Sequence, residues 1–479
     1  MNIPVSWSGS WSGMKALVLG LGKSGFSAAD TLIELGVEVT VVADKAHPAL
    51  EDLLEVIGAR FVISEKPSVL DQIGFEPDFV IVSPGFSPTN SLIQAVQARQ
   101  WPLLTDVDLA WRLRDKTETV SEWILVTGTN GKTTTCEMVQ AMLNQGGKRA
   151  IACGNIGTPI LDAVRDPIGF EYLVVELSSF QLHYLGEISP AVSLFLNIAD
   201  DHLDWHGDFE SYFAAKCKVY SNASQAIIFN EQDPKTLLAA QQADVQDGCR
   251  AVSFSLGSPA ISMVGYVDDY LVDRAFLDDR KNSALEIASS EDIGRISKLS
   301  MQLLANTAAA AAVARAVGVA PVQIREAIRD FELSPHRIQF CSQIDGVDYV
   351  NDSKATNAHA ADSSLASFDS IVWILGGLLK GTDPEPVIIK HASRIRAAVL
   401  LGTETELLKE LLAKHLPNIE VTEASKKDPM TSAVTLASEL ANLGDTVLLA
   451  PLAASMDQFQ DYADRGNKFI AAVKDLGVK

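Results

Sequence analysis

The segment from Glu122 to Met138 constrains the fold of this chain more than any other. It reads Glu-Trp-Ile-Leu-Val-Thr-Gly-Thr-Asn-Gly-Lys-Thr-Thr-Thr-Cys-Glu-Met. The apolar run from Trp123 to Val126 predicts a buried strand, the glycines predict a turn, and a helix is expected from Thr133 onward. Strand, glycine loop and helix in this order are typical of a phosphate-binding site. The alternative is an ordinary turn with an incidental lysine, which Gly-Lys-Thr-Thr directly after the apolar run disfavours.

The residue types in this loop suit a bound phosphate chain. Glycines let backbone N–H groups approach an anion, Lys132 supplies positive charge to a terminal phosphate, and the Thr133 hydroxyl is a ligand for Mg²⁺. The spacing departs from the common Walker pattern, because Val126 stands where that pattern has its first glycine.

Length and charge bound the class of protein. A chain of 479 residues is expected to form two to four domains. Its formal net charge of -22 argues against nucleic acid and anionic membranes as partners. Five scattered cysteines indicate a reducing compartment, and no apolar run is long enough to span a bilayer, so we expect a cytoplasmic protein. Residues 1–13 do not resemble a signal peptide, and we expect a flexible arm there.

The first part of the chain carries a second glycine motif. Residues 15–22 predict a strand that runs into Gly20-Leu-Gly-Lys-Ser-Gly25, a dinucleotide-binding fingerprint, and a second strand ends at Asp44, where such folds place a ribose-binding acid. A third strand, 79–82, ends in Ser83-Pro84-Gly85, a turn suited to a phosphate or sugar. Taken alone, the fingerprint suggests an NAD enzyme, but it specifies a nucleotide phosphate more reliably than a nicotinamide.

Strand-like and helical segments alternate through the rest of the chain, which predicts an α/β protein of three domains. Pro335 follows a predicted helix that it cannot continue, and a new series of strands begins after it. We therefore expect a Rossmann-like domain over 1–114, a central P-loop domain over 115–334 and a second Rossmann-like domain over 335–479. Irregular sequence between 247 and 292 is expected to form short antiparallel strands, and the alanine-rich 305–316 a helix.

The phosphate loop and two further motifs give a family resemblance. With Gly-Thr-Asn-Gly-Lys-Thr-Thr, Glu176-Leu-Ser-Ser-Phe-Gln-Leu182 and Asn351-Asp-Ser-Lys-Ala-Thr-Asn357, the chain closely resembles the Mur ligases of peptidoglycan synthesis. The match extends to Asp464-Arg-Gly466 near the end, and within the family the motifs point to the member that adds D-glutamate. The resemblance implies ATP, a first domain that binds UDP-N-acetylmuramoyl-L-alanine instead of NAD, and a third domain that closes over the second. We expect a monomer.

The resemblance also implies ligand sites. The residues matched to ATP contacts are Gly128, Thr129, Asn130, Gly131, Lys132, Thr133, Thr134, Asn306, Arg337 and Asp352. Those matched to the UDP substrate are Gly22, Lys23, Ser24, Asp44, Ser83, Pro84, Gly85, Asn155 and His202. Those matched to D-glutamate are Lys354, Thr356, Lys380, Ser455 and Tyr462.

Two Mg²⁺ sites are expected. Glu176 ends a predicted strand at the edge where α/β sheets place ligands, and a carboxylate there suits Mg²⁺. By family match, His202 helps to hold the second ion, whereas Asp200 and Asp204 are read as solvated loop acids. The expected metal ligands are thus Thr133, Glu176, His202 and Lys216, and the expected catalytic residues are Lys132, Glu176, His202 and Lys216.

Lys216 is expected to be carbamylated. It falls within an apolar stripe of helical spacing that includes Phe209, Tyr212 and Tyr220, so its amine should be partly desolvated. The matching lysine of the family is carbamylated. The alternative is a lysine that packs its stem on the helix while its ammonium reaches water.

Two segments depart from the family pattern. Leu378 and Leu379 precede Lys380 where the family carries polar or acidic residues, and Leu303 replaces an asparagine of the adenine site, where only Asn306 is retained. These departures leave two rival interpretations: a related ligase such as folylpolyglutamate synthase, which lacks the UDP-binding domain, and a nucleotide-sugar-binding protein without turnover.

Overall fold

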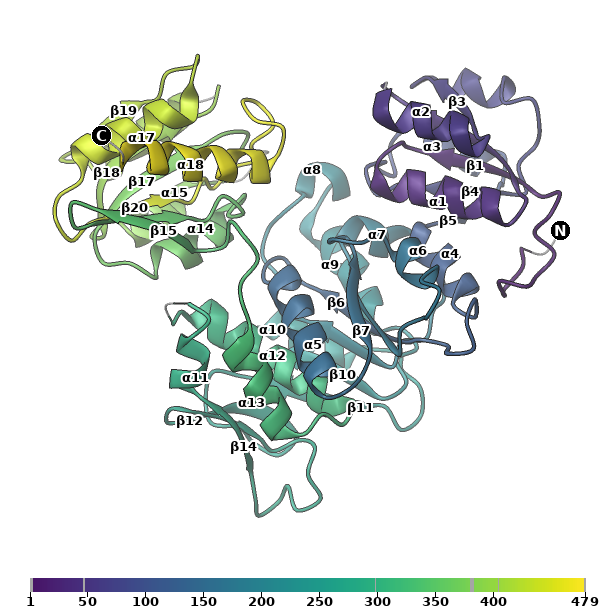
Figure 1. The fold of residues 1–479 in the computed structure, drawn as a ribbon, viewed down its shortest axis with the longest axis horizontal. Helices are drawn as coiled ribbons and strands as arrows, with labels where there is room; N and C mark the ends of the chain where they lie inside the picture. The colour runs from purple at the N-terminus through teal and green to yellow at the C-terminus, as the bar shows by residue number, and fades with distance from the viewer. Residues whose placement is uncertain (1–2, 46–47, 298, 380–382, 404, 478–479) are drawn as a thin grey trace. The chain divides into compact units, whose positions relative to one another are not determined.

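The computed structural model describes residues 3–45, 48–297, 299–379, 383–403 and 405–477. Contacts divide the chain into two compact units, the first formed by Met1–Ile198, Trp205–Ala288 and Asn306–Ile328 and the second by Ala199–Asp204, Ser289–Ala305 and Arg329–Lys479. Three β-sheets with flanking helices make up these units, which confirms the predicted α/β class (Figure 1). None of the described helices is long and apolar enough to cross a membrane.

The N-terminal domain is a five-stranded parallel sheet in the order β3-β2-β1-β4-β5. Its strands are β1 (Lys15–Leu19), β2 (Glu38–Ala43), β3 (Arg60–Ile63), β4 (Phe79–Val82) and β5 (Leu103–Leu104). Its helices are α1 (Lys23–Glu34), α2 (Pro48–Ile57), η1 (Pro67–Asp71), α3 (Ser91–Ala98) and α4 (Asp106–Leu113).

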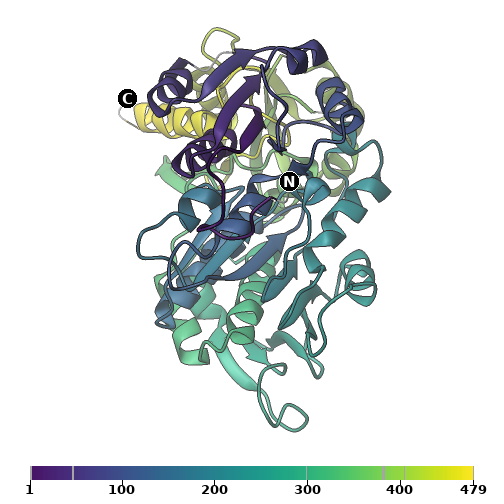
Figure 2. The same cartoon turned by 90° about the vertical axis from the view of Figure 1, so that its right-hand side faces the viewer.

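Alternate residues of each strand face opposite sides of this sheet, so both sides need a covering layer. Ala16 and Val18 of β1 belong to one core cluster with residues of α1 and α2, whereas Leu17 and Leu19 belong to another with η1 and α3. Figure 2 shows the sheet between these helices. Strand order reverses at β1, which places the glycine loop and β4 at the point where such sheets bind ligands.

The N-terminal arm does not form the flexible segment that we expected. Trp11 is 1 % exposed and packs edge-on against Phe79 at a centroid distance of 6.2 Å. Its indole Nε1 donates to Ser6 O at 2.8 Å, and Trp7 N donates to Asp115 Oδ1 at 2.7 Å. The arm is fixed because its aromatic side chains find partners far away in the sequence.

The central domain is built on a nine-stranded sheet in the order β14-β13-β12-β11-β10-β9-β6-β8-β7. Its strands are β6 (Glu122–Thr127), β7 (Ala150–Gly154), β8 (Tyr172–Glu176), β9 (Val192–Phe195), β10 (Ala226–Asn230), β11 (Arg250–Phe254), β12 (Met263–Val267), β13 (Tyr270–Asp273) and β14 (Leu285–Ser289). The helices along this part of the chain are α5 (Lys132–Gln145), α6 (Ile160–Val164), α7 (Ser179–Tyr184), α8 (Leu203–His206), α9 (Phe209–Cys217), η2 (Lys218–Tyr220), α10 (Pro234–Gln241), α11 (Ser290–Gly294), α12 (Met301–Ala316) and α13 (Pro321–Asp330). All of α11 and parts of α8, α12 and α13 belong to the second compact unit. As expected for the irregular stretch, this part of the sheet contains an antiparallel pair, β12 and β13, with β14 beyond it at the edge.

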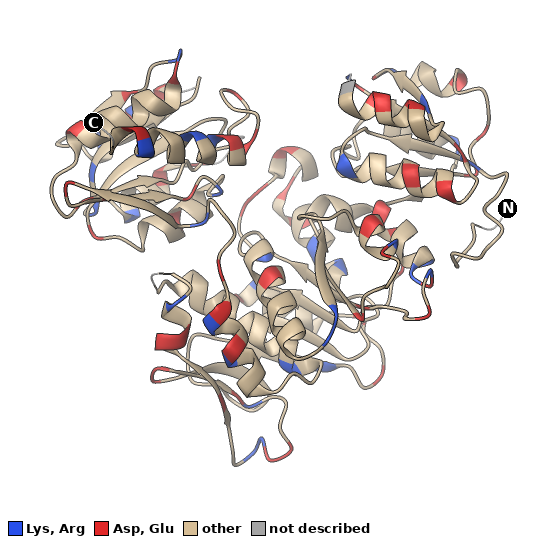
Figure 3. Cartoon of the chain, in the orientation of Figure 1, with Lys and Arg blue, Asp and Glu red and all other residues tan. Residues whose placement is uncertain are grey.

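The C-terminal domain is a six-stranded sheet in the order β15-β16-β20-β17-β18-β19, parallel except for β15. Its strands are β15 (Gln339–Ile344), β16 (Val347–Asn351), β17 (Ile371–Gly376), β18 (Ile395–Leu401), β19 (Glu420–Glu423) and β20 (Thr446–Leu449). Helices α14 (Ala358–Leu365), α15 (Glu385–Lys390) and α16 (Glu406–His415) share one core cluster, and α17 (Pro429–Leu440) and α18 (Tyr462–Leu476) share the other. Acidic and basic residues are interspersed along the helices (Figure 3).

Candidate active site

The phosphate loop lies between β6 and α5, in the interior of the central sheet. Gly131, the residue before α5, has φ +80°, a conformation that glycine adopts without steric cost. Lys132 folds back over the loop, and its Nζ donates to Gly128 O at 2.9 Å and to Thr129 O at 2.8 Å. The lysine is therefore held at the place where a phosphate chain would lie, with carbonyl oxygens as its present acceptors.

The strands on the β8 side of β6 contribute polar residues to this loop. On one side, β8 ends at Glu176, which is 2 % exposed; one carboxylate oxygen accepts from Thr133 Oγ1 at 2.8 Å and the other from Asn155 Nδ2 at 3.0 Å. Thr133 opens α5, and Asn155 follows β7. The structure thus joins one residue from each predicted set: Glu176 for the metal, Thr133 for the metal and nucleotide, and Asn155 for the UDP substrate.

The Glu176 carboxylate fits a divalent cation. Its two hydrogen bonds come from neutral groups, and no ion pair to it forms among the described residues. A buried carboxylate without a cation is costly, and an oxygen ligand beside a threonine hydroxyl is what Mg²⁺ prefers. Within the described ranges, no three His, Cys, Asp or Glu side chains gather closely enough to hold a metal ion. The predicted ligand set therefore depends on Thr133 and on a modified Lys216 in addition to Glu176.

Lys216 lies beneath the phosphate loop, near the end of α9. The residue is 2 % exposed, its Nζ donates to Gly128 O at 2.8 Å and to Thr127 Oγ1 at 3.3 Å, and it lies 5.0 Å from the ring centroid of Tyr212. Since Lys132 Nζ bonds the same Gly128 oxygen, the two amines are at most about 6 Å apart. Because Lys216 is buried, the alternative in which its ammonium reaches water is wrong. Lys218, two residues later, is exposed.

Two residues that hold the loop were not identified from the sequence. Asn197, after β9, accepts from Asn130 N at 2.9 Å through its side chain and donates to Asn130 O at 3.0 Å. Tyr212 shares a 2.9 Å hydrogen bond with Thr129 Oγ1. Asn197 follows a buried strand, and this position could have marked it as a candidate site residue. No sequence signal marked Tyr212, because the apolar spacing around it indicated only core packing.

The predicted UDP-site residues lie together at one edge of the N-terminal sheet. Gly22, Lys23 and Ser24 follow β1, Asp44 follows β2, and Ser83, Pro84 and Gly85 follow β4; β1 is the neighbour of both other strands. A Cβ on Gly25 would lie 2.0 Å from Gly20 O, so the fingerprint's last glycine is required for helix α1 to approach the loop.

The residues predicted for ATP and D-glutamate in the second unit surround the end of β16. Asp352 is buried, accepts a hydrogen bond from Ser364 Oγ, and has the positive charges of Arg337 and Arg465 nearby. Burial raises the pKa of Asp352 to about 6, against the lowering effects of that hydrogen bond and of Arg337. Lys354 Nζ lies 3.8 Å from the ring centroid of Tyr462.

Arg465 joins the two C-terminal motifs. It is 1 % exposed, and its guanidinium donates to Ser353 Oγ at 3.0 Å, to Ser353 O at 2.8 Å and to Ala453 O at 3.0 Å. Ser455, which follows soon after Ala453, is buried. The Asp464-Arg-Gly motif thus fixes the backbone on which the predicted glutamate residues Lys354, Thr356, Ser455 and Tyr462 stand.

The leucines that depart from the family pattern are partly or fully buried. Leu378 N donates to Ala454 O at 2.9 Å, Ala454 N returns a bond to Leu378 O at 3.0 Å, and Leu379 packs on the core cluster under α14–α16. Leu303 is buried, as is Asn306. Lys380 lies outside the described residues.

His202 was expected to help hold the second Mg²⁺, and this stays a prediction. It lies in Ala199–Asp204, which belongs to the second unit; its backbone N donates to Asp201 Oδ1 at 3.0 Å, and its ring Nε2 lies 3.7 Å from Asp201 Oδ2. Asp200 and Asp204 are exposed, as expected for solvated acids.

Comparison with known proteins defines the class. Residues 14–105 match a model described as Mur ligase MurD-like, N-terminal domain, residues 126–314 the Mur ligase middle domain, and residues 336–452 the Mur ligase, glutamate ligase domain. A nucleotide-binding loop between two Rossmann-like domains, with these matches, defines an ATP-dependent ligase that forms carbon–nitrogen bonds. The chain belongs to the Mur ligase family.

Curated relatives match along nearly the whole chain. A protein of Leifsonia xyli named UDP-N-acetylmuramoylalanine--D-glutamate ligase is 47% identical, over 98% of this chain and 94% of its own. Proteins of the same name from Tropheryma whipplei (strain Twist) and Streptomyces avermitilis are 46% and 42% identical, over 98% of this chain and 98% and 99% of theirs.

Solved structures share the fold at low sequence identity. The UDP-N-acetylmuramate-alanine ligase MurC of Thermotoga maritima has a TM-score of 0.58 at 16% identity, covering 97% of this chain and 100% of that one. MurF ligase of the same organism, in complex with ADP, has a TM-score of 0.56 at 17% identity, covering 97% and 96%.

Proposed function

We propose that this protein joins D-glutamate to the alanyl carboxylate of UDP-N-acetylmuramoyl-L-alanine, with ATP as the energy source, in peptidoglycan precursor synthesis. The observation that carries the proposal is the hydrogen-bonded set of Thr133, Glu176 and Asn155, which links the phosphate loop to a residue matched to the sugar substrate. The name of the relatives and the motifs around Asp352 support D-glutamate as the amino acid that is added. The protein acts as a cytoplasmic monomer in this proposal.

The reaction requires activation, because a carboxylate does not condense with an amine in water. A carboxylate oxygen of the substrate attacks the γ-phosphorus of ATP, the bond to ADP breaks, and an acyl phosphate forms. The amine of D-glutamate then attacks the acyl carbon, phosphate leaves with that oxygen, and the amine gives up a proton to yield the amide. Positioning and charge neutralisation are the protein's contribution to such steps.

The residues of the phosphate loop have defined parts in the first step. The N–H groups of Gly128–Gly131 bind the phosphate oxygens, and Lys132 exchanges its contacts with Gly128 O and Thr129 O for the γ-phosphate. Mg²⁺, when bound, would neutralise the charge that develops on the phosphates. Glu176 and Thr133 would hold it, and Asn155 keeps the Glu176 carboxylate in place.

A panel of amino acids tests the function. With ATP, Mg²⁺ and UDP-N-acetylmuramoyl-L-alanine present, phosphate release should depend on D-glutamate, and L-glutamate should support far less, because a chiral pocket with several fixed contacts discriminates strongly. The same assay with a folate in place of the UDP-sugar is the control. Preference for L-glutamate, or release with the folate, would contradict the proposal.

Carbamylation of Lys216 is part of the proposal. Burial and the nearby Lys132 ammonium both disfavour a charged Lys216, so the neutral amine is available to add CO₂, with loss of one proton, and become an anionic oxygen ligand. Lys216→Ala should lower turnover by about 100-fold or more, as loss of a metal ligand does. Lys218→Ala, two residues on and exposed, is the matched control and should be near normal.

The carbamate itself has a direct readout besides activity. The enzyme equilibrated with ¹³C-bicarbonate should give a carbamate carbon signal that Lys216→Ala lacks and Lys218→Ala retains. An unmodified Lys216 in fully active enzyme would contradict the proposal that Lys216 is carbamylated.

A further inference from the structure

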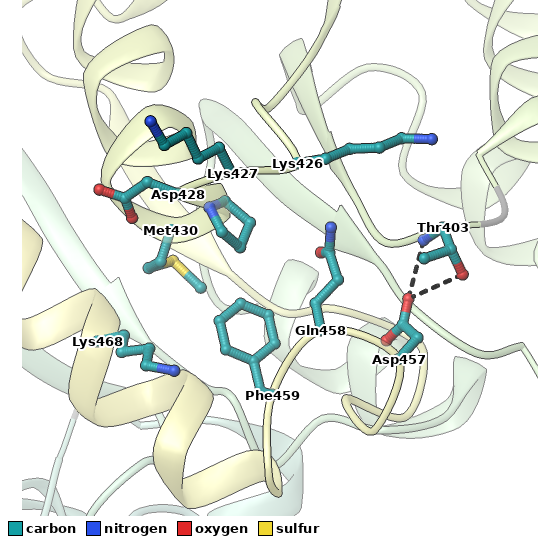
Figure 4. Close-up of a pocket in the computed structure, with 10 residues that line it drawn as sticks. Thr403, Lys426, Lys427, Asp428, Met430, Asp457, Gln458, Phe459 and Lys468 are labelled. Carbon is teal, nitrogen blue, oxygen red and sulfur yellow. Dashed lines mark hydrogen bonds between the residues drawn. The ribbon is translucent and has the colours of Figure 1, made fainter.

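A cavity of the C-terminal domain and a tyrosine of α7 have no part in the proposed reaction. The cavity is lined in part by Lys426 and Lys427 (Figure 4), which are exposed, and exposed lysines do not identify a ligand. The tyrosine, Tyr184, is hydrogen-bonded to a turn of the predicted UDP site. This second contact has a consequence for substrate binding.

The turn that follows β4 is held by a residue of the central domain. The turn comprises residues 83–86, and Phe86 N closes it by donating to Ser83 O at 3.3 Å. Phe86 O accepts a hydrogen bond from Tyr184 Oη at 3.0 Å, although Tyr184 lies 98 residues further along the chain. A distant segment therefore fixes the turn that carries three residues of the predicted UDP site.

The Tyr184 side chain is itself held in place by packing. It is half-buried and, like Phe86, packs against the apolar cluster that β4 shares with η1 and α3. Its ring also meets the rings of His183 and Trp205 edge-on, at centroid distances of 4.8 and 6.1 Å. Burial raises the pKa of Tyr184 to about 12, so the hydroxyl stays protonated and remains a donor at neutral pH.

The same turn lies against the glycine loop that follows β1. Ser83 N donates to Leu19 O at 3.0 Å. A Cβ added to Gly20 would lie 2.8 Å from Ser83 Oγ and 3.2 Å from the Phe86 ring, so the two loops are in close contact. Both loops belong to the predicted UDP site, and a displacement of the turn would therefore affect both.

Other contacts between the central and N-terminal domains join helices instead of substrate loops. Arg165 of α6 pairs with Asp30 and Glu34 of α1, at 2.6 and 2.8 Å. Among the hydrogen bonds of the described residues, the one from Tyr184 alone reaches from the central domain to the turn after β4. Tyr184 is therefore placed to act on UDP binding in a way that the helix contacts are not.

Helix α7 connects this contact to the other end of the site. The helix begins at Ser179, three residues after Glu176, and Ser178 and Gln181 form a capping box that fixes its start. Its last residue is Tyr184. A substrate whose UDP lies at the turn and whose carboxylate lies near Glu176 needs both ends of this helix at defined positions.

We propose that Tyr184 is a positioning residue for the UDP end of the substrate, because its hydroxyl holds residues 83–86 in the conformation that binds UDP. The inference rests on the proposed function, which supplies the UDP site. Without the hydrogen bond, the turn has to be ordered when UDP binds, and this ordering weakens binding. Tyr184 does not contact the phosphate loop, so ATP binding and the maximal rate should be unaffected.

The variant Tyr184→Phe tests this, because it removes the hydroxyl and keeps the ring. UDP binding to the full chain is measured by calorimetry, with ADP present at saturation to occupy the phosphate loop. We expect the affinity for UDP to fall by about three- to tenfold, the usual effect of one lost neutral hydrogen bond, and the affinity for ADP to stay the same. The KM for UDP-N-acetylmuramoyl-L-alanine should rise by a similar factor, with kcat unchanged.

Tyr220→Phe is the matched control. The Tyr220 hydroxyl also donates to a backbone carbonyl, Ile228 O at 2.8 Å, but that carbonyl belongs to β10. This variant loses a buried hydrogen bond and should keep the affinity of the unmodified protein for UDP. Hydrogen exchange gives a second readout: the Phe86 N–H should exchange faster in Tyr184→Phe and at the normal rate in Tyr220→Phe.

The outcomes separate this inference from the function on which it rests. Equal UDP affinities of the unmodified protein and Tyr184→Phe would overturn the positioning role alone. An equal loss in Tyr220→Phe, or a parallel loss of ADP affinity in Tyr184→Phe, would also overturn it, because either result indicates a general loosening of the fold. Failure of the unmodified protein to bind UDP would contradict the proposed UDP site itself, and the positioning role with it.

Discussion

At the residue scale, the Asp352 carboxylate links stability to pH. Burial raises its pKa to about 6 in the folded protein, so between about pH 4 and pH 6 the folded state holds this proton more tightly than the unfolded chain. Its contribution to stability is therefore full below pH 4 and lost as pH rises through 6, a change of about 3 kcal/mol. Hydrogen exchange of the backbone around β16 across this range measures it.

Asp352→Asn is the comparison for this measurement. The amide does not titrate, so exchange protection around β16 should lose this component of its pH dependence while the rest of the C-terminal domain keeps its own. Ser364, whose hydroxyl donates to Asp352, remains in place in the variant. Protection that falls equally in both proteins between pH 4 and 6 would show that another group is responsible.

At the scale of elements, the N-terminal arm stabilises the first sheet. Trp11 fills a buried site against Phe79, so Trp11→Ala should destabilise the first unit by about 3–5 kcal/mol, the usual cost of removing a large aromatic from a core. Val5→Ala, on the same arm but 70% exposed, should change stability by less than about 0.5 kcal/mol. Denaturant unfolding compares the two variants, and equal stabilities would mean that the arm does not contribute.

The elements that could be predicted from sequence are the buried ones. Continuous apolar runs predicted the strands β4 and β6 with bounds within a residue or two, because a strand that is covered on both faces shows an unbroken run of apolar residues. Edge strands such as β15 and β19 were missed, since their partly exposed residues resemble loop sequence. The arm was misread for a related reason: burial of Trp11 depends on Phe79, distant in sequence.

Site residues divide in the same way. Those within a local motif, such as Lys132 and Thr133, could be placed from sequence because the loop, the strand end and the helix start are all local features. Asn197 and Tyr212 could not be placed from sequence. Their contacts with the loop depend on which strand lies beside β6 and on how α9 packs beneath the loop. Residues that would contact the ligand directly can be found in short sequence motifs, whereas the residues that hold them in place are known only from the tertiary structure.

At the scale of the whole molecule, the central claim is that the domains cooperate in one ATP-dependent ligation. The phosphate loop and Glu176 belong to the first unit, and the residues matched to D-glutamate belong to the second. Each unit carries part of the chemistry, because the first step needs the phosphate loop and the second step needs the residues matched to D-glutamate. An acyl phosphate is the species that connects the two parts.

Transfer of ¹⁸O tests that connection most directly. UDP-N-acetylmuramoyl-L-alanine labelled with ¹⁸O in its alanyl carboxylate is incubated with enzyme, ATP, Mg²⁺ and D-glutamate, and the released phosphate is analysed by mass spectrometry or ³¹P NMR. Attack of the carboxylate on the γ-phosphorus predicts one ¹⁸O in the phosphate for each amide formed. Amide formation with unlabelled phosphate would contradict the account.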